Sequence, residues 1–267
     1  MTPLPTHLQA EPTAAWIFTA VGAIFFVASL AWALRESARE SSRLPLLALA
    51  GGAIAALEEG WIDRIIQLWY PLDSPLVMFT ALGIPQPLYV ALVYPGFIGL
   101  GAYVCYRGLL KYPDGRLLWP TFFGIVAMDF AFEVFATWTG VFYYYGEQPF
   151  QLVSNGWPMW VAPVNATGPL LAGWMIYRLE PQLRGPWRGF IVLIPPLAYA
   201  GVYGASSWPV CTAMNSQAPA ILIWLSAILT MSMCVLIVTI MRRVLRSRNV
   251  DDAVTDGMRR SVQMAVQ

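Results

Sequence analysis

The sequence predicts an all-α integral membrane protein, a bundle of seven transmembrane helices. Two observations support this expectation. Of the 267 residues, 58% are hydrophobic and only 12% are charged, a composition far outside that of ordinary globular domains. Apolar runs of about 20 residues, the length that spans a bilayer, recur along the chain. We therefore expect a multi-pass protein of the cell membrane or the endoplasmic reticulum membrane.

Proline and glycine residues separate the apolar runs and mark the joints between helices. The expected helices cover residues 14–34, 44–68, 85–108, 117–138, 157–177, 188–206 and 219–241. Pro195 and Pro196 are expected to break the sixth helix near its middle. Residues 1–241 then form a single transmembrane domain, and residues 242–267 form a polar, cytoplasmic C-terminal tail.

The basic residues orient the bundle. All but one of the 16 Lys and Arg residues lie between helices one and two, three and four, or five and six, or after helix seven. The exception is Arg64, near the outer end of helix two. By the positive-inside rule, the N-terminus lies outside and the C-terminus in the cytoplasm.

Helix two carries three acids deep in the expected span. Glu58 and Glu59 follow Arg43 by fifteen and sixteen residues, roughly 22 Å along a helix. Asp63 shares a face with Glu59, whereas Glu58 points about 100° away from Glu59.

Helix four carries two more acids at a similar depth, in the segment AMDFAFEVF. Asp129 and Glu133 are four residues apart and share one face. Each charged side chain at mid-membrane costs roughly 2.5–3.5 kcal/mol, so such residues face the bundle interior or a wet cavity. Burial and neighbouring like charges both favour the neutral acid. We therefore expect at least one carboxyl to be protonated at neutral pH and able to act as a general acid.

Three interpretations of these acids remain open. In the first, they belong to a packing network in which Arg64 neutralises one acid and Tyr, Trp or Asn165 side chains bind others. In the second, they form a proton or ion pathway. In the third, they are catalytic.

Asn165 lies on helix five at the same depth as the acids. A buried Asn of this kind either joins helices or binds a ligand. Aromatic residues gather at the outer helix ends, where they form an interface belt or line a pocket. They are Trp69, Tyr70, Trp138, Tyr143, Tyr144, Tyr145, Trp157 and Trp160.

Composition excludes several classes of function. The single histidine, His7, and three scattered cysteines predict no metal, haem or disulfide site. The only lysine, Lys111, lies in a loop, which argues against an intramembrane Schiff base. A net charge of +1 argues against a nucleic-acid partner. We expect chemistry without a cofactor.

The stretch from Glu133 to Pro163 reads EVFATWTGVFYYYGEQPFQLVSNGWPMWVAP. It resembles the bacterial carotenoid-biosynthesis membrane proteins that include bisanhydrobacterioruberin hydratases. The segment MDFAFEVF also resembles the aromatic-Glu signature of the small seven-helix membrane-bound terpene cyclases. The resemblance implies that acids on different helices protonate an epoxide or alkene and guide a carbocation.

The leading hypothesis is a membrane-embedded isoprenoid (terpene) cyclase acting on a lipophilic isoprenoid or prenylated small molecule. Its candidate catalytic residues are Glu133, Asp129, Glu59, Asp63 and Glu58. Its candidate substrate-binding residues are Asn165, Trp138, Tyr143 and Trp157. A carotenoid or isoprenoid hydratase is the nearest alternative. A proton- or cation-coupled transporter is the alternative from another class, and it predicts a polar path to the cytoplasmic side. A seven-helix receptor or structural subunit is a third class.

Overall fold

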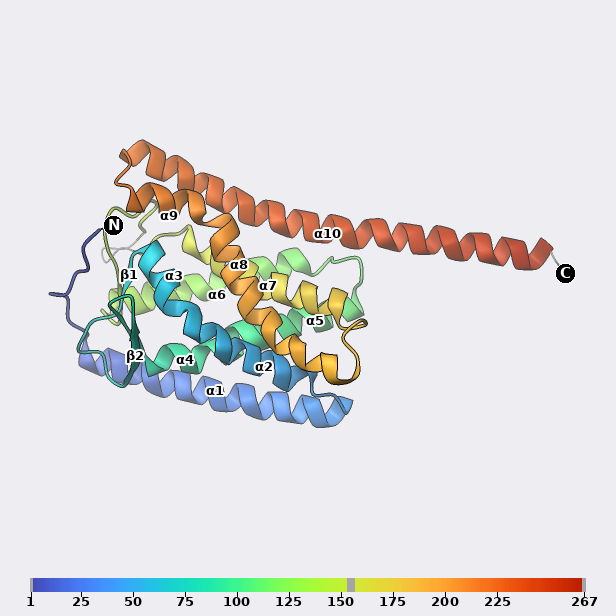
Figure 1. Ribbon diagram of the computed structural model, residues 1–267, viewed down its shortest axis with the longest axis horizontal. Helices are drawn as coiled ribbons and strands as arrows, with labels where there is room; N and C mark the ends of the chain where they lie inside the picture. Colours follow the sequence, from blue (N-terminus) through green and yellow to red (C-terminus); the bar gives the residue numbers. More distant parts are fainter. Residues whose placement is uncertain (1, 153–156, 266–267) are drawn as a thin grey trace.

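The computed structural model describes residues 2–152 and 157–265, with side chains through residue 247. Most of the helices run lengthwise in one bundle, and the two termini lie at its opposite ends (Figure 1). The helices are α1 (Pro12–Glu40), α2 (Leu44–Ala55), η1 (Ala56–Glu58), α3 (Glu59–Ile66), α4 (Leu88–Tyr94), η2 (Pro95–Leu100), α5 (Gly101–Lys111), α6 (Leu118–Trp138), α7 (Val161–Leu179), η3 (Gly185–Leu193), α8 (Ile194–Ser206), α9 (Trp208–Asn215) and α10 (Ala220–Ala265).

Six helical segments of the described chain are long and apolar enough to cross a membrane, which indicates a multi-pass membrane protein. They are Pro12–Glu40, Leu44–Ile66, Leu88–Lys111, Leu118–Trp138, Gly185–Ser206 and Ala220–Ser247. The remaining helix that the sequence predicted as a span, α7, is not among them. Most of α7 is buried, and it packs against α5, α6, α8 and α10.

Several helix boundaries differ from the sequence prediction: the first helix, for example, covers Pro12–Glu40 and not 14–34. The helix expected from residue 85 starts at Leu88, because Ile84–Pro87 forms a strand. The predicted break at Pro195–Pro196 is a change from the 3-10 turns of η3 to the α-helix α8 at Ile194, where proline fits the first turn. The last helix was predicted to end at residue 241, but α10 continues to Ala265.

Short strands gather at one end of the bundle, here called the hairpin end (Figure 1). Strands β1 (Leu68–Trp69) and β4 (Tyr143–Tyr144) pair antiparallel, with Leu68 opposite Tyr144. Strands β2 (Val77–Ala81) and β3 (Ile84–Pro87) form a hairpin. Its two turn residues, Leu82 and Gly83, both have positive φ, as the two-residue turns that match strand twist require.

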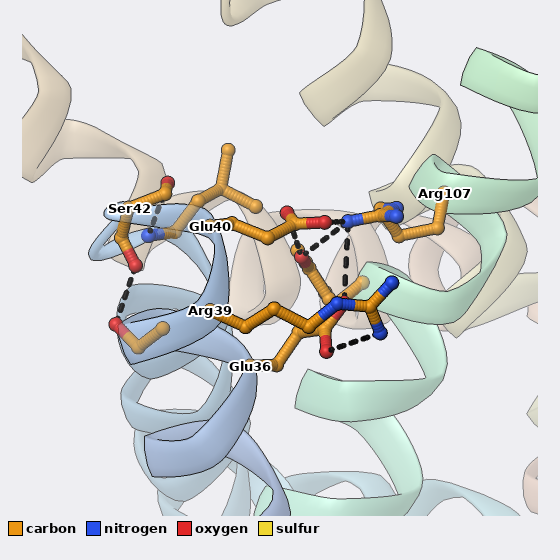
Figure 2. Close-up of polar contacts among 8 residues, drawn as sticks. Glu36, Arg39, Glu40, Ser42 and Arg107 are labelled. Carbon is orange, nitrogen blue, oxygen red and sulfur yellow. Dashed lines mark hydrogen bonds and ion pairs between the residues drawn. The ribbon is translucent and has the colours of Figure 1, made fainter.

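At the opposite end of the bundle, here called the arginine end, ion pairs join α1 to α5. Figure 2 shows Arg107 of α5 between Glu36 and Glu40 of α1, with Arg39 also contacting Glu36. The Arg107 Nη1 atom lies 3.3 Å from Glu36 Oε1, and it also contacts Glu40. A second pair, Arg188–Glu180, joins η3 to the end of α7 at 3.1 Å.

Glycine residues let α2 approach η2 closely at mid-bundle. A Cβ on Gly52 would lie 2.6 Å from the Gly99 nitrogen and 2.7 Å from the Tyr94 carbonyl oxygen. A Cβ on Gly99 would lie 2.4 Å from the Ala48 carbonyl oxygen. Small residues of this kind permit tight helix contacts in membranes. The segment η2 is a π-helix. Its first residue is Pro95, which lacks the N–H needed to continue the α-helical pattern.

The Gly52 contact generates a stability prediction. Gly52→Ala places a methyl group against backbone atoms that cannot move independently, so we expect a loss of about 1–3 kcal/mol, typical of overpacking. Gly124→Ala is the matched control, because nothing lies within 4 Å of its added Cβ. Thermal unfolding in detergent should show a lower midpoint for Gly52→Ala only. Equal midpoints for the two variants would contradict the close packing.

Candidate active site

A cavity of about 240 Å³ lies toward the hairpin half of the bundle, among α1, α3, α4, α6, α7 and α8. Four carboxyl groups line it: Glu59, Asp63, Asp129 and Glu133. One amide also lines it, that of Asn165. Six tyrosines complete the polar wall: Tyr70, Tyr89, Tyr94, Tyr144, Tyr199 and Tyr203. The rest of the lining is aliphatic or phenylalanine.

The spacing of the acids brings them to the cavity as predicted. Glu59 and Asp63 stand one turn apart on α3, and Asp129 and Glu133 stand one turn apart on α6. All four side chains are buried. Asp63 and Glu133, from different helices, line the same cavity. The two acid pairs therefore form one site.

Tyrosine hydroxyls hold both oxygens of Glu59. The Tyr70 hydroxyl donates to Oε1 at 3.1 Å, and the Tyr94 hydroxyl donates to Oε2. Tyr70 follows the end of α3, and its pKa is raised well above the ordinary value, first by burial and then by the nearby Glu59. The Tyr70 phenol consequently keeps its proton and remains a donor.

The local backbone sets the position of Tyr94. It is the last residue of α4 and directly precedes the π-helix η2. A π-helical turn changes the angular position of neighbouring side chains and is frequent at functional sites. Here the change occurs beside the residue that binds Glu59.

Asn165 connects the second acid pair to the same network. Its Nδ2 donates to Asp129 Oδ1 at 3.0 Å. Its Oδ1 accepts from the hydroxyls of Tyr199 at 3.1 Å and Tyr203 at 2.6 Å. The Tyr199 hydroxyl also lies 3.2 Å from that of Tyr94. One line of polar contacts thus runs from Glu59 through two tyrosines and an amide to Asp129.

A glycine on α7 makes room for this chain. A Cβ on Gly168 would lie 2.5 Å from Cδ2 of the Tyr199 ring. Gly168 is one turn from Asn165 and therefore on the same helix face. Without a side chain at 168, the Tyr199 ring packs close to α7, and its hydroxyl reaches Asn165.

The other acid of each pair is held from the hairpin end. The buried Gln86 of β3 donates its Nε2 to Asp63 Oδ2 at 2.9 Å. The Tyr144 hydroxyl of β4 donates to Glu133 Oε2 at 3.1 Å. Burial, followed by the Glu133 carboxyl, raises the pKa of Tyr144 well above its ordinary value. Tyr144 is therefore a proton-bearing donor, like Tyr70.

Each acid pair keeps one buried carboxyl oxygen without a hydrogen-bond partner. These atoms are Asp63 Oδ1 and Asp129 Oδ2. Among the side chains that the structure describes, no arginine or lysine pairs with the four acids. Arg64 instead donates to the Tyr145 hydroxyl at 2.8 Å. The network interpretation thus holds for the tyrosines and Asn165, and Arg64 neutralises none of these acids.

Four predicted site residues lie away from this cavity. Glu58 is partly buried and is not part of the cavity wall. Trp138 is 65% exposed at the end of α6. Tyr143 donates to the Gln9 carbonyl oxygen. Trp157 is fully buried and packs edge-on against Phe130.

The sequence reasoning missed most of the tyrosines in the cavity. Tyr89, Tyr94, Tyr199 and Tyr203 lie on α4 and α8, which carry no acid. The four-residue spacing of Tyr199 and Tyr203 is a signal that was available, because it places both hydroxyls on one face. Of the outer aromatic cluster, Tyr70 and Tyr144 do line the cavity, which confirms the pocket interpretation for these two.

Comparison of the chain with protein-family models, with curated proteins and with solved structures finds no match.

The Asn165 network generates a prediction about stability. Asn165→Leu leaves Asp129 Oδ1 and two tyrosine hydroxyls with one partner fewer, and each buried polar group left unpaired costs about 1–3 kcal/mol. Tyr203→Phe removes a single bond, so we expect a loss of about 1 kcal/mol. Thermal unfolding in detergent should rank wild type, Tyr203→Phe and Asn165→Leu in falling order. An unfolding midpoint for Asn165→Leu at or above that of Tyr203→Phe would contradict the network.

Proposed function

We propose that this chain is a membrane-embedded isoprenoid cyclase that uses buried carboxylic acids as its proton donor and acceptor. The observation that carries the proposal is the pair of unpartnered oxygens, Asp63 Oδ1 and Asp129 Oδ2, in a cavity walled by aromatic and aliphatic side chains. Buried carboxyl oxygens normally have partners. Both oxygens belong to residues that line one cavity, which fits a site whose remaining partner is a substrate.

The proposed reaction needs only these groups. A neutral carboxylic acid donates its proton to an epoxide oxygen or alkene carbon, and a ring bond forms as another double bond attacks the resulting cation. A carboxylate of the facing pair then removes a proton from carbon. The product has the mass of the substrate, and proton transfer between the facing acids restores the starting state.

The cavity wall suits a cationic intermediate. Aromatic ring faces stabilise cations, and Phe97, Phe132 and Phe142 line the cavity together with the tyrosines. These rings take the role that the sequence gave to Trp138, Tyr143 and Trp157. Asn165 has both its amide atoms engaged, so its proposed role is to hold Asp129 and two tyrosines in place.

The resemblance to membrane-bound terpene cyclases and carotenoid hydratases rests on the segment that carries Asp129 and Glu133. The cavity geometry supports the same chemistry independently of that resemblance. Quenching of the cation by water in place of internal deprotonation would give a hydratase, the nearest alternative.

A transporter receives less support. A polar path to the arginine end is expected for it, but the core there is apolar and includes Leu44, Ala48, Ala102 and Ile176. Along the second candidate span, the close contact at Gly52 comes between Ala48 of this core and Glu59.

We also propose that α7 is a seventh membrane crossing. Its 19 residues extend about 28 Å, close to the thickness of the hydrocarbon core. A helix surrounded by other helices needs less apolar surface than one facing lipid, which explains its lower hydropathy. Seven crossings, with the positive-inside rule, place the N-terminus outside and the C-terminus in the cytoplasm.

The seven-crossing topology predicts termini on opposite sides of the membrane. A green fluorescent protein fused to the C-terminus should fluoresce, and an epitope at the N-terminus should bind antibody on intact cells or sealed vesicles of outward orientation. Six crossings would place both termini on one side. Equal accessibility of the two tags would therefore contradict the proposal.

The catalytic proposal predicts that isosteric amides stop turnover without unfolding the protein. Glu133→Gln, Asp129→Asn and Asp63→Asn each keep an oxygen that accepts the native hydrogen bond, so unfolding midpoints should stay near that of wild type. Turnover should fall at least 100-fold, the scale of general acid–base catalysis. The assay is mass spectrometry of membranes supplied with epoxidised prenyl-aromatics, linear polyprenyl compounds and acyclic carotenoids.

Glu58→Gln tests a residue that the sequence predicted to be catalytic but that the structure places outside the cavity wall. Because Glu58 does not line the cavity, this variant should retain turnover. A product of unchanged mass, absent in Glu133→Gln, would support a cyclase, and a gain of one water would support a hydratase. No conversion of any substrate class would contradict the enzyme proposal and favour flux assays with proteoliposomes.

A further inference from the structure

One wall of the cavity consists of side chains that also lie on the outer surface of the bundle. Val21 and Phe25 of α1 line the cavity and are 54% and 39% exposed. Met128 and Phe132 of α6 also line it and are 51% and 36% exposed. All four side chains are apolar, and both helices are candidate membrane spans. The cavity therefore reaches the surface that faces lipid.

Ring contacts close the hairpin side of this opening. Phe18 of α1 packs against Phe132 and Phe135 of α6, with ring centroids 5.2 and 5.8 Å apart. Along α1, Val21 and Phe25 follow Phe18 toward the arginine end, while α6 runs the other way and places Met128 beyond Phe132. The opening thus lies between α1 and α6, at about the depth of Asp129.

The hairpin end itself is covered by several segments. The N-terminal segment is held by a bond from the Ala10 amide to Asp73 and by one from the Tyr143 hydroxyl to Gln9. Beneath it, Gln148 donates to the Ile66 carbonyl oxygen, and Trp69 is fully buried. The arginine half of the bundle is closely packed at Gly52 and Gly99. Among the described residues that line the cavity, the exposed side chains are those of α1 and α6 that border the gap.

The size of the cavity limits what it can enclose. Its volume is about 240 Å³, compared with about 150 Å³ for an engineered cavity that holds one benzene molecule. A long isoprenoid does not fit inside as a whole. A reacting terminus fits, provided that the remaining chain lies in the opening or in the bilayer.

We propose that the gap bordered by Val21, Phe25, Met128 and Phe132 is a lateral portal through which the reacting end of a lipid-dissolved isoprenoid enters from the bilayer while its tail stays outside. This inference rests on the proposed function for the identity of the reacting group, but the route is a property of the structure. The portal predicts that the protein selects substrates by their reacting end. It also predicts that tails of different lengths are accepted, because the tail stays outside the cavity.

A labelling experiment tests the route without requiring turnover. Val90 lies on α4, lines the cavity and is buried, and Val90→Cys nearly preserves its volume. The probe is N-dodecylmaleimide dissolved in vesicles that contain the full chain. A sulfonated, membrane-impermeant maleimide is the aqueous comparison. Alkylation is measured by mass spectrometry on the peptide that contains residue 90, with the wild-type peptide as the blank.

Portal variants and a matched control complete the design. Val21→Trp and Met128→Trp fill the gap, whereas Ile24→Trp adds the same side chain to α1 at a position that is exposed and does not line the cavity. We expect N-dodecylmaleimide to label Cys at residue 90 and the sulfonated reagent not to. Each portal variant should slow this labelling at least 10-fold, and Ile24→Trp should leave its rate within twofold.

Two results would overturn the portal. One is labelling by the sulfonated reagent at a rate equal to that of the lipophilic one, which would place the entrance at an aqueous surface. The other is lipophilic labelling that is absent, or that the two portal variants leave unchanged. Because the readout is alkylation, a functioning portal and a failed cyclase assay remain distinguishable.

Discussion

Four buried carboxyl groups line one cavity of the bundle, and the surrounding structure supplies most of their hydrogen-bond partners. Six tyrosines and an asparagine line the same cavity, and no arginine or lysine pairs with these acids among the described side chains. Neutral donors leave the acids free to exchange a proton, whereas a permanent cation would fix them as carboxylates. Hydrogen bonding without charge neutralisation is therefore the constraint on which the site depends.

That constraint accounts for several irregular backbone features around the cavity. The π-helix η2 begins directly after Tyr94, and Gly168 leaves space for the Tyr199 ring. Strand β3 brings the buried Gln86 to Asp63, and β4 brings Tyr144 to Glu133. In a bundle of regular helices with simple loops, these donors would have to come from other positions. The strands at the hairpin end thus supply hydrogen-bond donors to the acids and also cover them.

The sequence predicted the acidic half of the site and little of the donor half. Charges in an apolar helix are rare and costly, so Asp129 and Glu133 are conspicuous, and their spacing places them on one face. Tyrosines in an apolar helix carry no comparable signal, because Tyr94 or Tyr203 fits a core or an interface equally well. Gln86 lay at the predicted start of a helix, and only the pairing of β3 with β2 reveals its position. Local propensity also did not show that α10 continues past residue 241.

The helix α1 contributes to the cavity without contributing to its chemistry. Its residues in the wall, Val21 and Phe25, are both apolar, while every acid and hydrogen-bond donor in the wall comes from another element. Evolution can therefore alter the two functions separately. Under the proposed portal, substitutions at Val21 and Phe25 would change which molecules enter the cavity and would leave the acids and their hydrogen-bond donors intact. A family built on this plan would diversify in substrate range through its first helix while keeping one reaction.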